Sequence, residues 1–300
     1  MNFIALKQKF SKSIELYNNI NEDYLGLLAA GIAFYFLMAA FPALAAAISL
    51  YGIFSDPHFI EDQINLLSRF LPPEALSIFT KQITVLLKTS GSALGLSFVI
   101  STLFAIYSAT KGVGALIKGL NIAYNRKETR GVVQLTLTGF VLTLGLMIFL
   151  LAALSVIAIL PVFFNIVEIP GLTPDIYLQL RWPLLFFTAL LGLEVLYSFA
   201  PCHPKFKWRW MSRGSFYATL IWVTASIFFS LFVTNFGSYN ETYGSISAII
   251  ILLLWFWMSA MIILLGAEIN HVFKKSAQDD SQDEVSLKAG SESVDEAQKI

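Results

Sequence analysis

One uncharged apolar run, Ser245 to Ala267, limits the folds open to this chain more than any other feature. It contains no Asp, Glu, Lys or Arg and consists mainly of Ile, Leu, Trp and Met. About 20 apolar residues, at about 1.5 Å of helix rise each, are enough to cross the hydrocarbon core of a bilayer. The run therefore predicts a transmembrane helix.

The composition extends this prediction from one segment to most of the chain. The sequence is 56% hydrophobic and only 13% charged, whereas soluble domains carry about 25% charged residues. These values indicate a polytopic membrane protein. The single cysteine, Cys202, excludes an internal disulfide framework.

Five further apolar runs precede the first one described. They cover residues 25–54, 92–109, 132–164, 182–199 and 214–234. We therefore predict an all-α, polytopic integral membrane protein with six transmembrane helices. Pro72-Pro73 divides two stretches with apolar residues at helical spacing, so residues 55–90 are expected to form an amphipathic helical hairpin between spans 1 and 2.

Three regions follow from this pattern. Residues 1–24 are expected to form an amphipathic cytoplasmic segment at the membrane surface, with a solvated helix as the alternative. Residues 25–273 form the six-helix membrane domain. Residues 274–300 are rich in acids, Ser and Gln, with few large apolar residues, so they are expected to be a disordered acidic tail.

Lysine and arginine are concentrated on one side of this topology, which marks the cytoplasmic side. That side holds Lys7, Lys9, Lys12, Lys111, Lys118, Arg126, Lys127, Arg130, Lys205, Lys207, Arg209, Arg213, Lys274 and Lys275. The other side holds Arg69, Lys81, Lys88 and Arg181. Both termini are therefore expected in the cytoplasm. Splitting the third run into two spans would place the basic loop at residues 201–213 outside, against this distribution of Lys and Arg.

The motifs of soluble enzyme sites are missing from the sequence. There is no HExxH, no CxxC, no Walker loop and no Rossmann glycine pattern, so no metal site and no cofactor are predicted. We expect no catalytic residues, no enzymatic activity and no nucleic-acid partner.

Glu194, inside the fourth apolar run, is the first candidate for a functional residue. Carboxylates within a membrane are costly and usually face the bundle interior or a polar path. A hydrogen-bonded structural glutamate is the alternative. A candidate polar path joins Glu194 to an irregular segment before the sixth span that contains Tyr239, Asn240, Tyr243 and Gly244.

The cytoplasmic end of the sixth span carries a second polar set. Glu268 and Asn270 lie there, and Glu268 is expected to pair with a basic residue such as Lys111 or Arg213 for structural reasons. Ser245, Leu252, Ser259 and Gly266 recur every seven residues along the span. Three of these four are small, which predicts close helix packing.

Three segments resemble the YihY/BrkB family of bacterial inner-membrane proteins, a family once described as ribonuclease BN. They are AAGIAFYFLMAAFP (29–42), SATKGVGALIKGLNIAYN (108–125) and NFGSYNETYGSISAIIILLLWFWMSAMIILLGAEIN (235–270). The resemblance implies six helices with cytoplasmic termini in the bacterial plasma (inner) membrane. It also implies export, lipid-related transport or a link to virulence.

Two classes of function are consistent with these features. The first is a transporter, an exporter or a lipid-translocating protein, whose partners are the lipid bilayer and a lipid or small-molecule substrate. The alternative is a non-transporting scaffold that recruits a protein partner through its basic inner loops or acidic tail. A ribonuclease ranks last, because the sequence lacks the expected metal ligands.

Overall fold

The computed structural model describes residues 14–54, 91–166, 174–202, 211–235 and 245–297. Residues 14–22 are helical, and six long helices follow. These are α2 (Leu25–Phe54), α5 (Gly91–Ala123), α6 (Val132–Ile166), α7 (Pro174–Phe199), α8 (Arg213–Asn235) and α10 (Ser245–Ala297). The described part of the chain contains no strand, so the all-α prediction is confirmed there.

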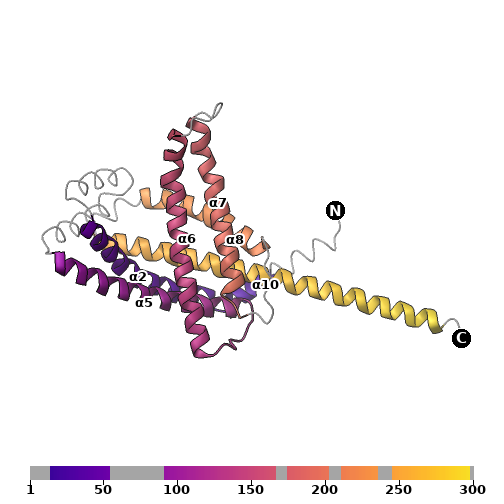
Figure 1. Ribbon diagram of the computed structural model, residues 1–300. Coiled ribbons are helices and arrows are strands. Elements are labelled where there is room, and N and C mark those ends of the chain that lie inside the picture. Colours follow the sequence, from indigo (N-terminus) through magenta and orange to yellow (C-terminus); the bar gives the residue numbers. More distant parts are fainter. Residues whose placement is uncertain (1–13, 55–90, 167–173, 203–210, 236–244, 298–300) are drawn as a thin grey trace.

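The helices form one body in which α2 packs along α5 and α10 packs against both α2 and α8. α6 and α7 lie side by side and run steeply across the direction of α2, α5 and α10 (Figure 1). The N-terminal helical segment, residues 14–22, lies against α10 near the point where α10 leaves the bundle. These contacts place residues 14–22 and the exit of α10 at the same end of the bundle.

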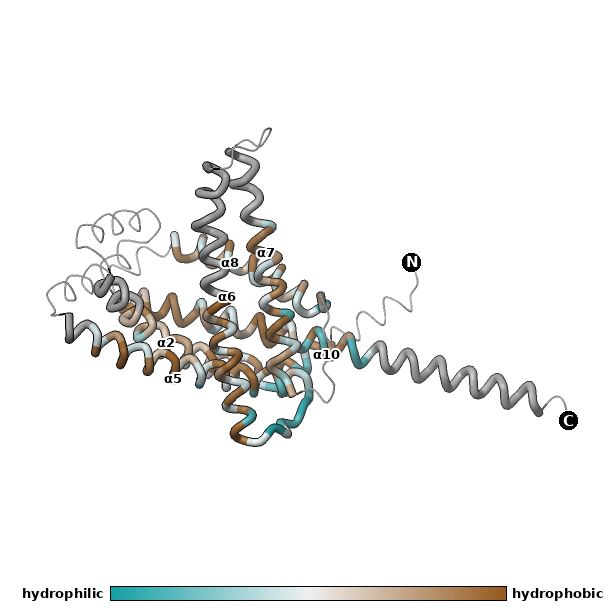
Figure 2. The backbone as a smooth tube through the Cα atoms, in the orientation of Figure 1, coloured by the Kyte–Doolittle hydropathy of each residue, from teal (hydrophilic) through white to brown (hydrophobic). Residues whose placement is uncertain are grey.

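Five of the described helices contain a segment long and apolar enough to cross a membrane. The segments are Leu25–Ala46, Gly95–Ala123, Val132–Phe149, Arg213–Thr234 and Ile246–Ser276. α7 contributes a shorter apolar segment, Pro183–Phe199. Figure 2 shows hydrophobic residues along the helices and hydrophilic residues gathered between α5 and α6 and at the point where α10 leaves the bundle.

The outer surface of these helices is apolar. Val132 is 83% exposed and Leu27 is 73% exposed, and many other large apolar side chains point outward. Soluble proteins rarely expose apolar surface on this scale. The surface is suited to contact with lipid chains.

The best-packed core lies at one end of the bundle. It joins Leu25 and Ile32 of α2, Ile117 and Leu120 of α5, and Leu264 of α10. The second apolar run was predicted to end at residue 109, but α5 continues to Ala123 because the apolar positions after Lys111 keep helical spacing. Lys111 itself is exposed, and this added length of α5 supplies much of the core.

The predicted small-residue stripe of α10 meets α8 at two positions. Gly266 packs directly against Gly214, and Ala218 lies beside it. The second position is Ser259, two turns before Gly266 on α10, whose Oγ accepts a hydrogen bond from the indole N–H of Trp222 on α8 (3.0 Å). Without side chains at the two glycines, the backbones approach closely, as small residues allow in membrane helices.

α10 continues as one helix to Ala297 and extends away from the bundle (Figure 1), over most of the segment for which a disordered tail is predicted. No proline interrupts residues 274–297, and Ala, Glu, Lys and Gln are good helix formers. Extending an existing helix also avoids the cost of nucleation. The predicted hairpin at residues 55–90 lies outside the described residues.

Candidate functional site

Glu194 lies in the last two turns of α7 and is only 3% exposed. Its Oε2 accepts a hydrogen bond from the backbone N–H of Ser212 (2.8 Å), the residue before α8. Ser212 Oγ in turn accepts from the backbone N–H of Ser215 (3.2 Å), which is the N-cap arrangement. The carboxylate thus sits at the N-terminus of α8, where the helix dipole favours negative charge.

Asn270 of α10 connects this cap to two other parts of the chain. Its Oδ1 accepts from the backbone N–H of Gly214 (2.7 Å). Its Nδ2 donates to Ser212 Oγ (3.0 Å) and to the hydroxyl oxygen of Tyr124 (3.0 Å). One amide therefore links α10 to the start of α8 and to the end of α5.

Two tyrosines close the cluster. The Tyr197 hydroxyl donates to the backbone carbonyl of Ile263 (2.8 Å), and its ring meets that of Tyr124 edge to face, 6.4 Å between centroids. Burial raises the pKa of the Tyr124 hydroxyl well above its ordinary value, so it stays protonated. We call these six residues the polar junction: Tyr124, Glu194, Tyr197, Ser212, Ser215 and Asn270.

Glu268 faces the other way, toward the N-terminal helical segment. It is fully buried, and its Oε2 accepts from Nδ2 of Asn19 (3.1 Å). This differs from the predicted pairing with Lys111 or Arg213. Each of those cations instead lies over an aromatic ring, Lys111 over Tyr107 at 5.3 Å and Arg213 over Phe273 at 4.6 Å.

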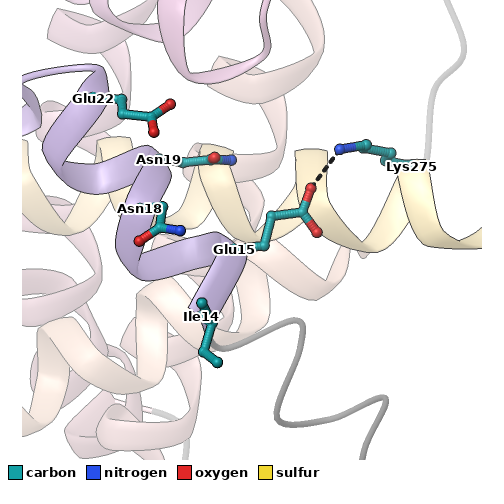
Figure 3. A pocket seen from close by; sticks show the side chains of 6 residues that line it. All are labelled: Ile14, Glu15, Asn18, Asn19, Glu22 and Lys275. Carbon is teal, nitrogen blue, oxygen red and sulfur yellow. Dashed lines mark hydrogen bonds and ion pairs between the residues drawn. The ribbon is translucent and has the colours of Figure 1, made fainter.

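The N-terminal helical segment and α10 also meet at the surface (Figure 3). Lys275 Nζ lies 2.7 Å from Glu15 Oε1. An open pocket of about 430 Å³ lies beside this ion pair, lined by Ile14, Glu15, Asn18, Asn19, Glu22 and Lys275. The ion pair is solvent-exposed, so it adds little stability.

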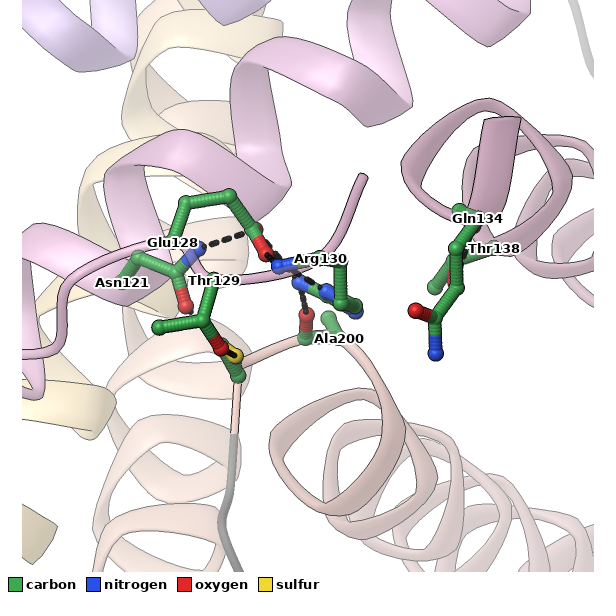
Figure 4. Close-up of polar contacts among 8 residues, drawn as sticks. Asn121, Glu128, Thr129, Arg130, Gln134, Thr138 and Ala200 are labelled. Atoms are coloured by element: carbon green, nitrogen blue, oxygen red, sulfur yellow. Dashed lines mark hydrogen bonds and ion pairs between the residues drawn. The ribbon is translucent and has the colours of Figure 1, made fainter. Parts of the chain in front are cut away.

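A third polar contact fastens the α5–α6 turn to the end of α7 (Figure 4). Glu128 accepts from Arg130 Nε (2.8 Å) and Nη2 (2.7 Å), and from Asn121 Nδ2 (2.8 Å). Arg130 Nη2 also donates to the carbonyl of Ala200 (3.0 Å). The Arg130 guanidinium holds the pKa of Glu128 down at about 2.

Of the residues in the predicted polar path, the structure describes Glu194. Tyr239, Asn240, Tyr243 and Gly244 lie outside the described residues, but α10 begins at Ser245, directly after them. The rise of α10 from Ser245 to Asn270 is roughly 38 Å. Glu194 lies beside Ser212, which Asn270 contacts, so it stands at the opposite end of the bundle from Ser245.

Sequence reasoning identified Glu194, Glu268 and Asn270 but missed most of their partners. Ser212 and Asn19 are ordinary polar residues in sequence, and only the fold brings them to the carboxylates. A serine directly before the uncharged run of α8 was a usable N-cap signal. In the described residues, no three His, Cys, Asp or Glu side chains are grouped so that they could hold a metal ion.

Comparison with known proteins gives a consistent set of relatives. The model of the family "Virulence factor BrkB" matches residues 16–289. The putative ribonuclease-like protein YfkH of Bacillus subtilis is 32% identical over 82% of this chain and 89% of its own length. UPF0761 membrane proteins of Vibrio parahaemolyticus (VP0125) and Vibrio atlanticus are 27% and 24% identical, over 85% and 94% of this chain and 79% and 90% of theirs. No solved structure matches the chain.

Proposed function

The chain belongs to the virulence factor BrkB family, and from that premise we propose that it is a transporter, an exporter or a lipid-translocating protein. It is a multi-pass bacterial membrane protein, as its apolar helices and its membrane-protein relatives show. Its cargo is a lipid or a small molecule, and its path includes the polar junction.

The observation that supports this proposal is the buried position of Glu194 at one end of a bundle whose outer surface is apolar. A carboxylate there requires donors, and α8 supplies one through the Ser212 N–H. Side chains from the end of α5, from α7, from the start of α8 and from α10 converge on the same point. Ionisable groups inside a membrane bundle most often mark a path for a polar species.

Lipid translocation can be tested in vesicles that contain the purified protein and a trace of NBD-labelled phosphatidylglycerol. Dithionite bleaches only outer-leaflet label, so translocation raises the bleached fraction above that of protein-free vesicles. We expect this rise with the wild-type chain and a several-fold slower rate with Glu194→Gln. Glutamine keeps an oxygen that can accept from Ser212, so the variant removes the charge and preserves the cap.

The exposed Glu22→Gln variant is the matched control, because it removes one acid that is not part of the polar junction. Equal rates for Glu194→Gln and the wild type would remove Glu194 from the path. Bleaching identical to protein-free vesicles would argue against lipid as the cargo and direct the search to soluble solutes.

The scaffold alternative has one observation in its favour, the projection of α10 beyond the bundle (Figure 1). A projecting helix whose sequence is rich in acids offers a surface for a basic partner. The scaffold reading predicts that deletion of residues 277–300 abolishes co-purification of a partner and leaves vesicle flux at background.

A ribonuclease remains the least favoured function, although one relative carries the name ribonuclease-like. We propose that this chain is not an enzyme. The test is incubation of the purified protein with single-stranded RNA and Mg²⁺ or Mn²⁺. Degradation that follows the protein through purification would contradict the proposal.

A further inference from the structure

The seam between the N-terminal helical segment and α10 contains a buried acid that the proposed path does not use. Glu268 is 0% exposed. Asn19 donates to its Oε2 (3.1 Å), but its Oε1, equally buried, receives no hydrogen bond. Leaving an oxygen of a buried carboxylate without a hydrogen bond is unfavourable, because the charge has lost its water and gained no donor in exchange.

A second carboxyl group faces Glu268 across this seam. The side chain of Asp23, half-buried at the end of the N-terminal segment, lies near enough to Glu268 for its charge to act on that carboxyl group, but no hydrogen bond joins the two side chains. Two carboxyl groups can share a hydrogen bond only when one of them holds a proton. Two ionised carboxylates at this separation would repel each other strongly.

The other charges around the seam do not neutralise Glu268. They are Glu15 on the N-terminal segment, His271 and Lys275 on α10, and Arg126 in the turn after α5. Lys275 pairs with Glu15. Among the contacts of the described residues, no ion pair involves Asp23 or Glu268.

From this arrangement we propose that Asp23 and Glu268 form a carboxyl pair that binds one proton. The proton allows the two carboxyl groups to share a hydrogen bond at Glu268 Oε1, and this bond keeps the N-terminal helical segment on α10. Loss of the proton leaves two facing negative charges, one of them buried, and the segment separates from α10. The site is therefore a proton-binding clasp, and it works whatever cargo the protein carries.

Infrared spectroscopy of the full chain in lipid tests the bound proton directly. A protonated carboxyl group has a C=O stretch well separated from the carboxylate bands. Near neutral pH we expect such a band in the wild type and its loss in Glu268→Gln. Asp23→Asn should also remove it, because the new amide can donate to an ionised Glu268. Glu194→Gln is the control and should leave the band unchanged.

Spin labels test the clasp itself. In a Cys202→Ser background, labels at Tyr17→Cys and Met211→Cys, both at exposed positions, report the distance between the N-terminal segment and the start of α8. We expect one short distance in acid and a longer, broader distribution in alkali. With Glu268→Gln or Asp23→Asn added, the short distance should persist at both pH values.

A His271→Gln variant separates the clasp from histidine titration, and its distance should still change with pH. If Glu268→Gln does not fold, Asp23→Asn answers the same question at a half-buried position. The proposal is overturned by a neutral-carboxyl band that neither substitution changes. A wild-type distance that is the same in acid and alkali overturns it equally. Neither result depends on whether vesicle transport is found.

Discussion

Gly214 is the residue at which a single added methyl group should do most damage. A Cβ there would overlap the carbonyl oxygen of Gly266 and crowd the Asn270 side chain. Backbone atoms cannot move aside, so we expect Gly214→Ala to destabilise the protein by roughly 1–3 kcal/mol. Gly145→Ala in α6 is the matched control, because no atom lies within 4 Å of its Cβ position.

Thermal unfolding in detergent, followed by circular dichroism, compares the two variants. Gly145→Ala should be neutral or more stable than the wild type, since alanine favours helix by about 0.5–1 kcal/mol. Equal melting temperatures for the two variants would contradict the close packing of α8 against α10 at Gly214.

Glu128 predicts a pH dependence of stability. Its pKa falls from an ordinary 4.5 to about 2, chiefly through hydrogen bonds from Arg130. A lowered folded-state pKa stabilises the fold above the unfolded value, and this stabilisation is lost as the pH falls from about 4.5 through about 2. We expect the melting temperature to drop across that window and Glu128→Gln to flatten part of the drop. Glu22→Gln should keep the wild-type slope.

The candidate site was only half predictable from the sequence, for a physical reason. An acid within an apolar run can be recognised from the sequence alone, because burying its charge in the membrane is costly and therefore unusual. Its partner is not, since Glu194 takes its donor from Ser212 and Glu268 takes its donor from Asn19, at the far end of the chain. Nothing in the local pattern around Arg213 showed that it would contact Phe273 rather than Glu268.

The end of α5 is set by one left-handed residue. Asn125 has φ 49°, and its N–H and that of Arg126 bond back to the carbonyls of Ile122 (2.7 Å) and Asn121 (2.7 Å). This is the Schellman arrangement, in which the left-handed position favours Gly, then Asn. We expect Asn125→Gly to match or exceed the wild type in stability, and Asn125→Ala to lose about 1 kcal/mol. Chemical unfolding in detergent would rank the stabilities of the wild type and the two variants. A higher stability for Asn125→Ala than for Asn125→Gly would contradict the left-handed turn.

α10 runs into the segment for which the sequence predicts disorder. Its acidic C-terminal part cannot bury a core, which predicted disorder, yet it continues the helix that begins at Ser245. A low apolar content excludes packing but does not exclude helix when the preceding turn is already formed. Deletion of residues 277–300 should therefore lower the total helical signal in circular dichroism and leave the melting temperature unchanged. An unaltered helical signal would indicate that residues 277–300 are disordered, as the sequence predicts.

The whole molecule was easier to predict than its sites, because apolar length alone locates most of its helices. α2, α6 and α8 begin and end close to the predicted runs. α5 and α7 extend beyond them, since amphipathic turns outside the apolar run add helix that hydropathy does not detect. The number of crossings is the remaining question, because five helices have long apolar segments and α7 has a shorter one.

Contacts between segments far apart in the chain bear on that number. Glu15 meets Lys275, Arg130 meets Ala200, and Asn270 meets Ser212. The N-terminal segment, the α5–α6 turn, the α7–α8 connection and the exit of α10 therefore share one end of the bundle. If that end lies on one side of the membrane, the chain crosses an even number of times, and α7 must cross together with α6.

Cysteine labelling in intact cells tests this topology. In a Cys202→Ser background, Lys127→Cys should react with a membrane-impermeant maleimide only after permeabilisation, because its turn belongs to the lysine-rich side that is predicted to face the cytoplasm. Lys81→Cys and Thr173→Cys, in the connections before α5 and between α6 and α7, should react without permeabilisation. Labelling of Thr173→Cys only in opened cells would mean that α6 and α7 form a hairpin that does not cross. The chain would then make four crossings, with the N-terminal segment and the exit of α10 still on one side.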